Sequence, residues 1–153
     1  MGRPELIVLS GPQGSGKSTW VREQVGDSHV RINLDMLRSQ NRENILLHAC
    51  LAGGISAVVD RTNPTRAQRR RYLDLAQASG FKATLVVFQV SLQTALARNA
   101  SRSGRARVPD VAIRGTLAKL ETVDPAAPWD EVRVVPEAGG SHAWVTDQAE
   151  ELE

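Results

Sequence analysis

The chain has 153 residues, 41% of them hydrophobic, so we expect one folded domain with a single apolar core. The formal net charge of +2 excludes a strongly basic field over the whole molecule. The only cysteine, Cys50, cannot form an intramolecular disulfide, and no apolar run approaches the length of a membrane span. Because the N-terminus lacks the apolar core of a signal peptide, we expect a cytoplasmic protein without membrane attachment.

The first predicted elements are a strand over residues 5–9, a glycine-rich loop and a helix over residues 18–25. The loop matches G-x-x-x-x-G-K-[ST] at every fixed position. Its glycines allow backbone N–H groups to turn toward a phosphate, its lysine adds a positive charge, and its serine hydroxyl suits Mg²⁺. The sequence therefore predicts a site for a nucleoside triphosphate with magnesium. Ser18 is the expected metal ligand, and the phosphate ligands are Gly11, Gln13, Gly14, Ser15, Gly16, Lys17, Ser18 and Thr19.

Strands and helices continue to alternate after this loop. We expect further strands over residues 29–33, 55–59, 81–88 and 129–135, and helices over residues 36–51, 63–79, 92–98 and 109–120. Asn63 should cap the second of these helices, with Pro64 in its first turn. The alternation predicts an α/β fold with a central parallel five-stranded sheet between helices. We assign residues 1–138 to this domain and residues 139–153 to a C-terminal extension, either a short hairpin or a frayed tail.

Polar residues follow the second and third predicted strands, on the side of the sheet where the glycine-rich loop lies. Asp35 could accept a proton from an attacking hydroxyl, and Arg38, three residues later, should share a helical face with it. Asp60 and Asn63 should face the same crevice. The alternative is structural: Asp35 caps a helix and pairs with Arg38, and Asn63 caps the next helix, a role compatible with binding.

Arginines also gather in a loop around Gly104, and we expect this loop to be a mobile lid. Such arginines can close over phosphates and stabilise the charge of a loose transition state. The alternative is a surface loop made basic by codon usage. An acceptor base combined with lid arginines favours a kinase over a GTPase or a motor ATPase. The arginines of the loop are Arg98, Arg102, Arg105 and Arg107.

Four segments together resemble the kinase domain of the polynucleotide 5′-hydroxyl kinases of phage and bacterial nucleic-acid end repair. They are residues 11–20, 33–38, 58–63 and 98–109. The resemblance implies a three-layer P-loop kinase, similar to the nucleoside monophosphate kinases, with an arginine-rich lid. It also implies ATP as the donor, Mg²⁺ as the cofactor and the 5′-hydroxyl end of DNA or RNA as the acceptor.

The same resemblance implies roles for individual residues. Asp35 would be the general base, and Arg38 would hold the phosphate on the 3′ side of the acceptor nucleotide. The clamp on the ATP phosphates would be Arg98 and Arg102, and Asp60 and Asn63 would shape the acceptor pocket. The catalytic set would be Lys17, Asp35, Arg38 and Arg102.

One departure from the family keeps other functions open. The stretch from Arg38 to the third strand is about one helix, whereas we expect a longer helical insertion in the phage enzyme. A shallower acceptor site could serve a small alcohol, such as a sugar acid, a nucleoside or an antibiotic. A non-catalytic nucleotide-binding module is the third candidate, but it would leave Asp35 and the lid arginines without a role.

Overall fold

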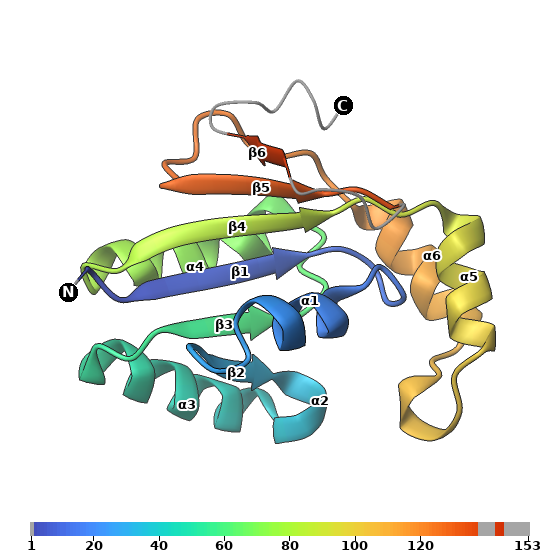
Figure 1. Ribbon diagram of the computed structural model, residues 1–153, viewed down its shortest axis with the longest axis horizontal. Helices are drawn as coiled ribbons and strands as arrows, with labels where there is room; N and C mark the ends of the chain where they lie inside the picture. Colours follow the sequence, from blue (N-terminus) through green and yellow to red (C-terminus); the bar gives the residue numbers. More distant parts are fainter. Residues whose placement is uncertain (1, 138–142, 146–153) are drawn as a thin grey trace.

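The structure is a computed structural model and describes residues 2–137 and 143–145. Its centre is a six-stranded sheet in the order β2-β3-β1-β4-β5-β6 (Figure 1). The strands are β1 (Glu5–Ser10), β2 (Val30–Asn33), β3 (Ala57–Asp60), β4 (Lys82–Phe88), β5 (Glu131–Val135) and β6 (Ala143–Val145). The first five run parallel, which confirms the predicted sheet, and β6 adds an antiparallel edge next to β5. This edge strand comes from the predicted C-terminal extension, whose remaining residues lie outside the described part.

Helices cover both faces of the sheet. They are α1 (Lys17–Gln24), α2 (Leu34–Leu37), α3 (Gln40–Gly53), α4 (Arg66–Ala78), α5 (Leu92–Ala100) and α6 (Asp110–Lys119). In Figure 1, α1 lies in front of the sheet and α4 behind it, while α5 and α6 lie beyond the ends to which the strand arrows point. The predicted three-layer arrangement is therefore confirmed. Among the described residues, no helix is long and apolar enough to cross a membrane.

The central strand β1 supplies both apolar cores. Leu6 and Val8 belong to the core beneath α3 and α4. Ile7 and Leu9 belong to the core beneath α1, where Trp20 meets Phe88 edge-on with the ring centroids 6.1 Å apart. Since each of Leu6–Leu9 is at most 3% exposed, the strand is buried on both faces, as its continuous apolar run predicts. This burial fixes the strand end from which the glycine-rich loop departs.

The predicted helix over residues 36–51 is wrong in its first turns, because the structure has two helices there. Arg38 adopts a left-handed conformation with φ of 67° and ends α2. Ser39 then starts α3 by accepting a hydrogen bond from the backbone N–H of Arg42. Asp35 and Arg38 consequently do not share the face of one helix. Asn33, rather than Asp35, caps α2.

The predicted start of the next helix is also wrong. Asn63 has φ of 40°, and α4 begins only at Arg66. Thr65 is the cap: its hydroxyl accepts from the N–H of Gln68 at 3.2 Å, and the Gln68 side chain accepts from the N–H of Thr65 at 3.1 Å. This reciprocal pair satisfies two N–H groups that would otherwise lack partners, so it outcompetes the asparagine cap.

Candidate active site

The glycine-rich loop has the backbone that its sequence predicts. It leaves β1, turns through Gly14 at φ of 81° and Gly16 at φ of 97°, and enters α1 at Lys17. A Cβ on Gly14 would lie 2.9 Å from the carbonyl oxygen of Ala95 in α5, so only glycine fits there. Strand, loop and helix therefore form the phosphate-binding arrangement, and we call residues 11–18 the P-loop.

Lys17 is the electrostatic centre of the site. Its Nζ donates to the carbonyl oxygens of Gly11 at 2.8 Å and Pro12 at 2.7 Å. Burial lowers the pKa of Lys17 to about 8; the charges of Asp60 and Asp35 raise it, and that of Arg102 lowers it. Two carboxylates and one arginine predicted from separate segments thus act on the same ammonium group.

Other polar atoms of the P-loop have no partner among the described residues. These atoms are Oε1 of Gln13 and Oγ of Ser15, both buried. Ser18 and Thr19 are exposed at the start of α1. A loop that carries unpaired buried polar atoms beside exposed hydroxyls fits a polar ligand such as a triphosphate with its cation. Among the described residues, no group of three or more His, Cys, Asp or Glu side chains could hold a metal by itself.

Asp60 lies at the end of β3 and is only 5% exposed. Arg31 in β2 donates to its carboxylate through Nε at 2.8 Å and lies 2.6 Å away through Nη2, while Nδ2 of Asn33 donates at 3.2 Å. Nη2 of Arg31 also donates to the Ser18 hydroxyl at 3.4 Å. Arg31 was not among the residues predicted from the sequence. The signal for it was its place next to Ile32 in a strand, because neighbouring side chains of a strand point to opposite faces.

Asn63 is buried and bonded within the fold. Its Nδ2 donates to the carbonyl oxygen of Leu9 at 2.9 Å, and its own carbonyl oxygen accepts from the Ser10 hydroxyl at 2.9 Å. The neighbouring Thr62 carbonyl oxygen accepts from the N–H of Gly11 at 2.8 Å. These bonds hold the loop after β3 directly against the P-loop. A role of Asn63 in acceptor binding remains a prediction.

Of the arginines predicted to form a lid, Arg98 lies in the last turn of α5 and Arg102 follows just after the helix ends at Ala100. Arg98 donates to the carbonyl oxygen of Gly14 at 2.9 Å, so it is attached to the P-loop. Arg102 is half-buried, and its charge lowers the pKa of Lys17. Asn99, between them, is fully buried and bonds to both the N–H and the C=O of Val108. The loop from residue 100 to residue 107 is therefore closed at its base.

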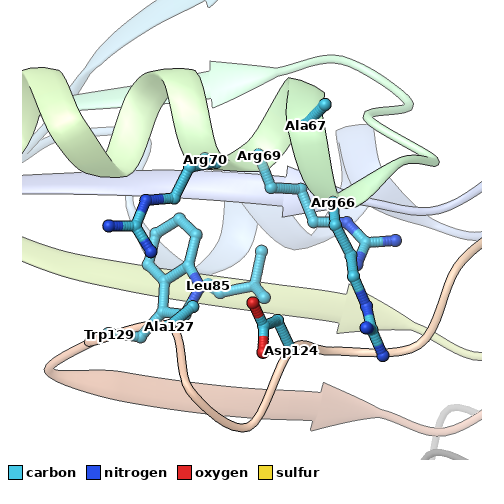
Figure 2. Close-up of a pocket in the computed structure, with 8 residues that line it drawn as sticks. All are labelled: Arg66, Ala67, Arg69, Arg70, Leu85, Asp124, Ala127 and Trp129. Carbon is cyan, nitrogen blue, oxygen red and sulfur yellow. The ribbon is translucent and has the colours of Figure 1, made fainter.

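Of the arginines of α4, Arg66, Arg70 and Arg71 are exposed, whereas Arg69 is buried and has a structural role. Arg69 is 3% exposed and donates to the carbonyl oxygens of Asn63, Pro64, Glu121 and Thr122. Burial lowers its pKa to about 10. Arg66, Arg69, Arg70 and Trp129 are among the residues that line a hollow of about 370 Å³. Figure 2 shows the three arginine side chains extending from α4. Because Arg69 is occupied by backbone carbonyls, its main function here is to join α4 to the segment before β5.

A family described as AAA domain matches residues 40–123, more than half of the chain. The matched range includes Asp60, Arg98 and Arg102. The bifunctional polynucleotide phosphatase/kinase of Schizosaccharomyces pombe is 27% identical over 136 residues, which are 86% of this chain and 33% of that protein. The chain thus spans about a third of the length of this curated relative.

Two solved structures have the same fold. One is a chain in the structure of the Pnkp1/Rnl/Hen1 RNA repair complex, with a TM-score of 0.64 and 23% identity over 78% of this chain and 45% of that chain. The other is a gluconokinase from Sinorhizobium meliloti 1021, with a TM-score of 0.59 and 22% identity over 90% of this chain and 85% of that chain. At these identities the likeness concerns the fold alone, which is that of a P-loop kinase.

Proposed function

The chain belongs to the AAA domain family as a P-loop kinase domain, and from this premise we propose that it transfers the γ-phosphate of ATP to the 5′-hydroxyl end of a polynucleotide. One arrangement carries the proposal: Arg98 and the loop after β3 are both hydrogen-bonded to the P-loop, at Gly14 and Gly11. The charges of Asp60, Arg102 and Asp35 also act on the pKa of Lys17 in that loop. A general base and a lid arginine around the phosphate-binding lysine are what alcohol phosphorylation requires. The identity to a polynucleotide phosphatase/kinase favours a nucleic-acid acceptor.

The proposed reaction is an in-line displacement. Asp35 accepts the proton of the 5′-hydroxyl, the oxygen forms a bond to the γ-phosphorus, and the bond to the β,γ-bridging oxygen breaks to release ADP. Lys17 must leave the P-loop carbonyls and turn to the phosphates, while Arg102 and Arg98 balance the charge that spreads over the transferring group. Arg38 binds the phosphate on the 3′ side of the acceptor nucleotide.

Magnesium would be held by the Ser18 hydroxyl together with phosphate oxygens, and it would supply charge neutralisation of the triphosphate. The chemistry of the site fits such an ion, since the Ser18 hydroxyl is exposed at the start of α1, directly after the loop that would hold the phosphates. The protein's own contribution is to orient the triphosphate along the P-loop N–H groups.

A kinase for a small alcohol is the second candidate. It is favoured by the short connection between β2 and β3, where α2 and the single helix α3 are the only helices among the described residues. Arg38 distinguishes the two candidates, because every polynucleotide acceptor carries a phosphate near the attacked hydroxyl and a neutral sugar does not.

The test is phosphoryl transfer from γ-labelled ATP with Mg²⁺ to three acceptors: a short 5′-hydroxyl oligonucleotide, a nucleoside 3′-phosphate and a free nucleoside. The proposal expects label on the first two and little on the third. No label on any acceptor, from a protein that still binds ATP, would refute it and favour the small-alcohol kinase. In the same assay, Asp35→Asn should keep ATP binding and lower turnover by roughly two to four orders of magnitude; near-normal turnover would exclude Asp35 as the base.

A further inference from the structure

A second hollow of about 370 Å³ lies between α3 and α4, beside the end of β3. Polar side chains from three segments line it, among them Gln40, Asn44, Arg61, Gln68 and Arg71. The loop after β3 forms one wall of this hollow through Arg61, and the next residue of that loop, Thr62, accepts the hydrogen bond from Gly11 of the P-loop. The hollow and the P-loop therefore lie on either side of one short loop.

A fully buried carboxylate, that of Glu43, contacts three of the residues that line the hollow. Glu43 is 0% exposed; its Oε1 accepts from the Tyr72 hydroxyl at 2.6 Å, and its Oε2 lies 3.3 Å from Nη1 of Arg61. Nη1 of Arg71 lies 3.9 Å from the carboxylate. A buried carboxylate requires such partners, because an unpaired charge inside a protein is strongly unfavourable. Glu43 therefore holds arginines from two different segments near each other.

Both arginines are oriented before any ligand arrives. Nη1 of Arg61 donates to Tyr72 and to Gln40, at 3.1 and 3.2 Å. The guanidinium of Arg71 lies over the Tyr72 ring, 5.0 Å from its centroid, and its Nη2 donates to Asn44 at 2.6 Å. Within the described residues, the hydrogen bonds of Arg61 all leave from Nη1, so its Nε and Nη2 donors remain available to a ligand.

The charges of this cluster do not balance. Two guanidinium groups face one carboxylate, which leaves a net charge of about +1 in a polar hollow. Burial alone would lower the pKa of Arg61, but the hydrogen bond from its guanidinium to Tyr72 and the charge of Glu43 raise it, so this arginine stays charged. Forked donors with one excess positive charge suit a single phosphate group.

We propose that this hollow binds the second phosphate of the acceptor strand, one nucleotide beyond the phosphate assigned to Arg38. The proposal rests on the proposed function. The hollow lies close to Arg38 along the chain. Gln40, in the wall of the hollow, follows Arg38 by two residues, so their Cα atoms are at most about 7 Å apart. A strand whose first phosphate meets Arg38 can thus place its next phosphate at Arg61 and Arg71.

The experiment compares two acceptors at saturating ATP: a nucleoside 3′-phosphate and a dinucleotide with two phosphates. In the wild type, the second phosphate should lower KM about tenfold. Arg71→Ala should remove this gain while leaving the KM of the nucleoside 3′-phosphate unchanged. Arg70→Ala is the matched control, because Arg70 is 47% exposed against 41% for Arg71 and pairs with Asp74 instead of the cluster. Circular dichroism melting should show both variants folded.

Salt gives an independent readout. With a longer single-stranded acceptor, the slope of log(1/KM) against log salt should become shallower by about 0.7 in Arg71→Ala, since one phosphate contact is lost. If the wild type phosphorylates the nucleoside 3′-phosphate but gains nothing from the second phosphate, or if Arg71→Ala keeps the gain, this inference is wrong and the proposed function stands. If no nucleotide acceptor is phosphorylated, both are wrong.

Discussion

Protonation of Lys17 should couple ATP binding to pH. In the unliganded protein, burial lowers the pKa of this lysine to about 8, and its Nζ is held by the carbonyl oxygens of Gly11 and Pro12. Bound phosphates would surround the same nitrogen with negative charge, so the pKa should return toward the usual lysine value of about 10.4. ATP binding near pH 8 should therefore take up a proton from solution.

The size of the effect follows from the pKa. With a value of about 8, the neutral fraction of Lys17 in the free protein is about one tenth at pH 7, one half at pH 8 and nine tenths at pH 9. The apparent Kd for ATP should rise about tenfold between pH 7 and pH 9, which corresponds to about 1.4 kcal/mol. Phosphate groups titrate near pH 6, so their own protonation contributes little in this window.

Calorimetry with a non-hydrolysable ATP analogue, in two buffers of different ionisation heat, measures the proton uptake directly. About half a proton per bound nucleotide is expected at pH 8 and about nine tenths at pH 9. Lys17→Arg is the control, because arginine stays charged throughout and should abolish the uptake. Binding without uptake in the wild type, or with the same uptake in the arginine variant, would refute the assignment of the proton to Lys17.

Two further predictions concern the lid. Arg102→Ala should lower turnover far more than it weakens ATP binding, measured by steady-state kinetics beside calorimetry; a pure loss of ATP affinity would mean that Arg102 acts only before the transition state. Asn99→Ala should lower the free energy of unfolding by about 1–3 kcal/mol in urea, because it leaves the N–H and C=O of Val108 without their partner. Ser101→Ala, at the exposed end of the same helix, should change stability much less, and equal losses in the two variants would contradict this reasoning.

The P-loop could be predicted from sequence because its requirements are local. Gly14 and Gly16 need positive φ, Lys17 opens the helix, and all of this information lies within eight residues of chain. The β-strands were equally accessible, since apolar runs such as Leu6–Leu9 are buried on both faces. In these cases, short-range chemistry alone determines the conformation.

The helix starts near residues 38 and 65 were mispredicted because they depend on contacts with distant parts of the chain. Whether Arg38 continues a helix or ends it in the left-handed conformation depends on how the chain turns from β2 into α3, which is a tertiary matter. Two residues before α4 are possible caps, Asn63 and Thr65. Thr65 caps the helix through reciprocal hydrogen bonds with Gln68, whereas the side-chain amide of Asn63 donates to the carbonyl oxygen of Leu9, 54 residues away. Local preference could suggest either cap.

The missed residues of the site depend on strand order, which the sequence does not contain. Because β3 lies between β1 and β2, the Asp60 carboxylate meets Arg31 from one neighbouring strand while it acts on Lys17 beside the other. Glu43 and Tyr72 likewise come together across 29 residues, since α3 and α4 cover the same face of the sheet. The spacing of the P-loop motif is enough to predict where the phosphates of a triphosphate would bind. The proposed acceptor side is built by contacts between elements, so the acceptor of the proposed reaction must be sought in those contacts rather than in the P-loop.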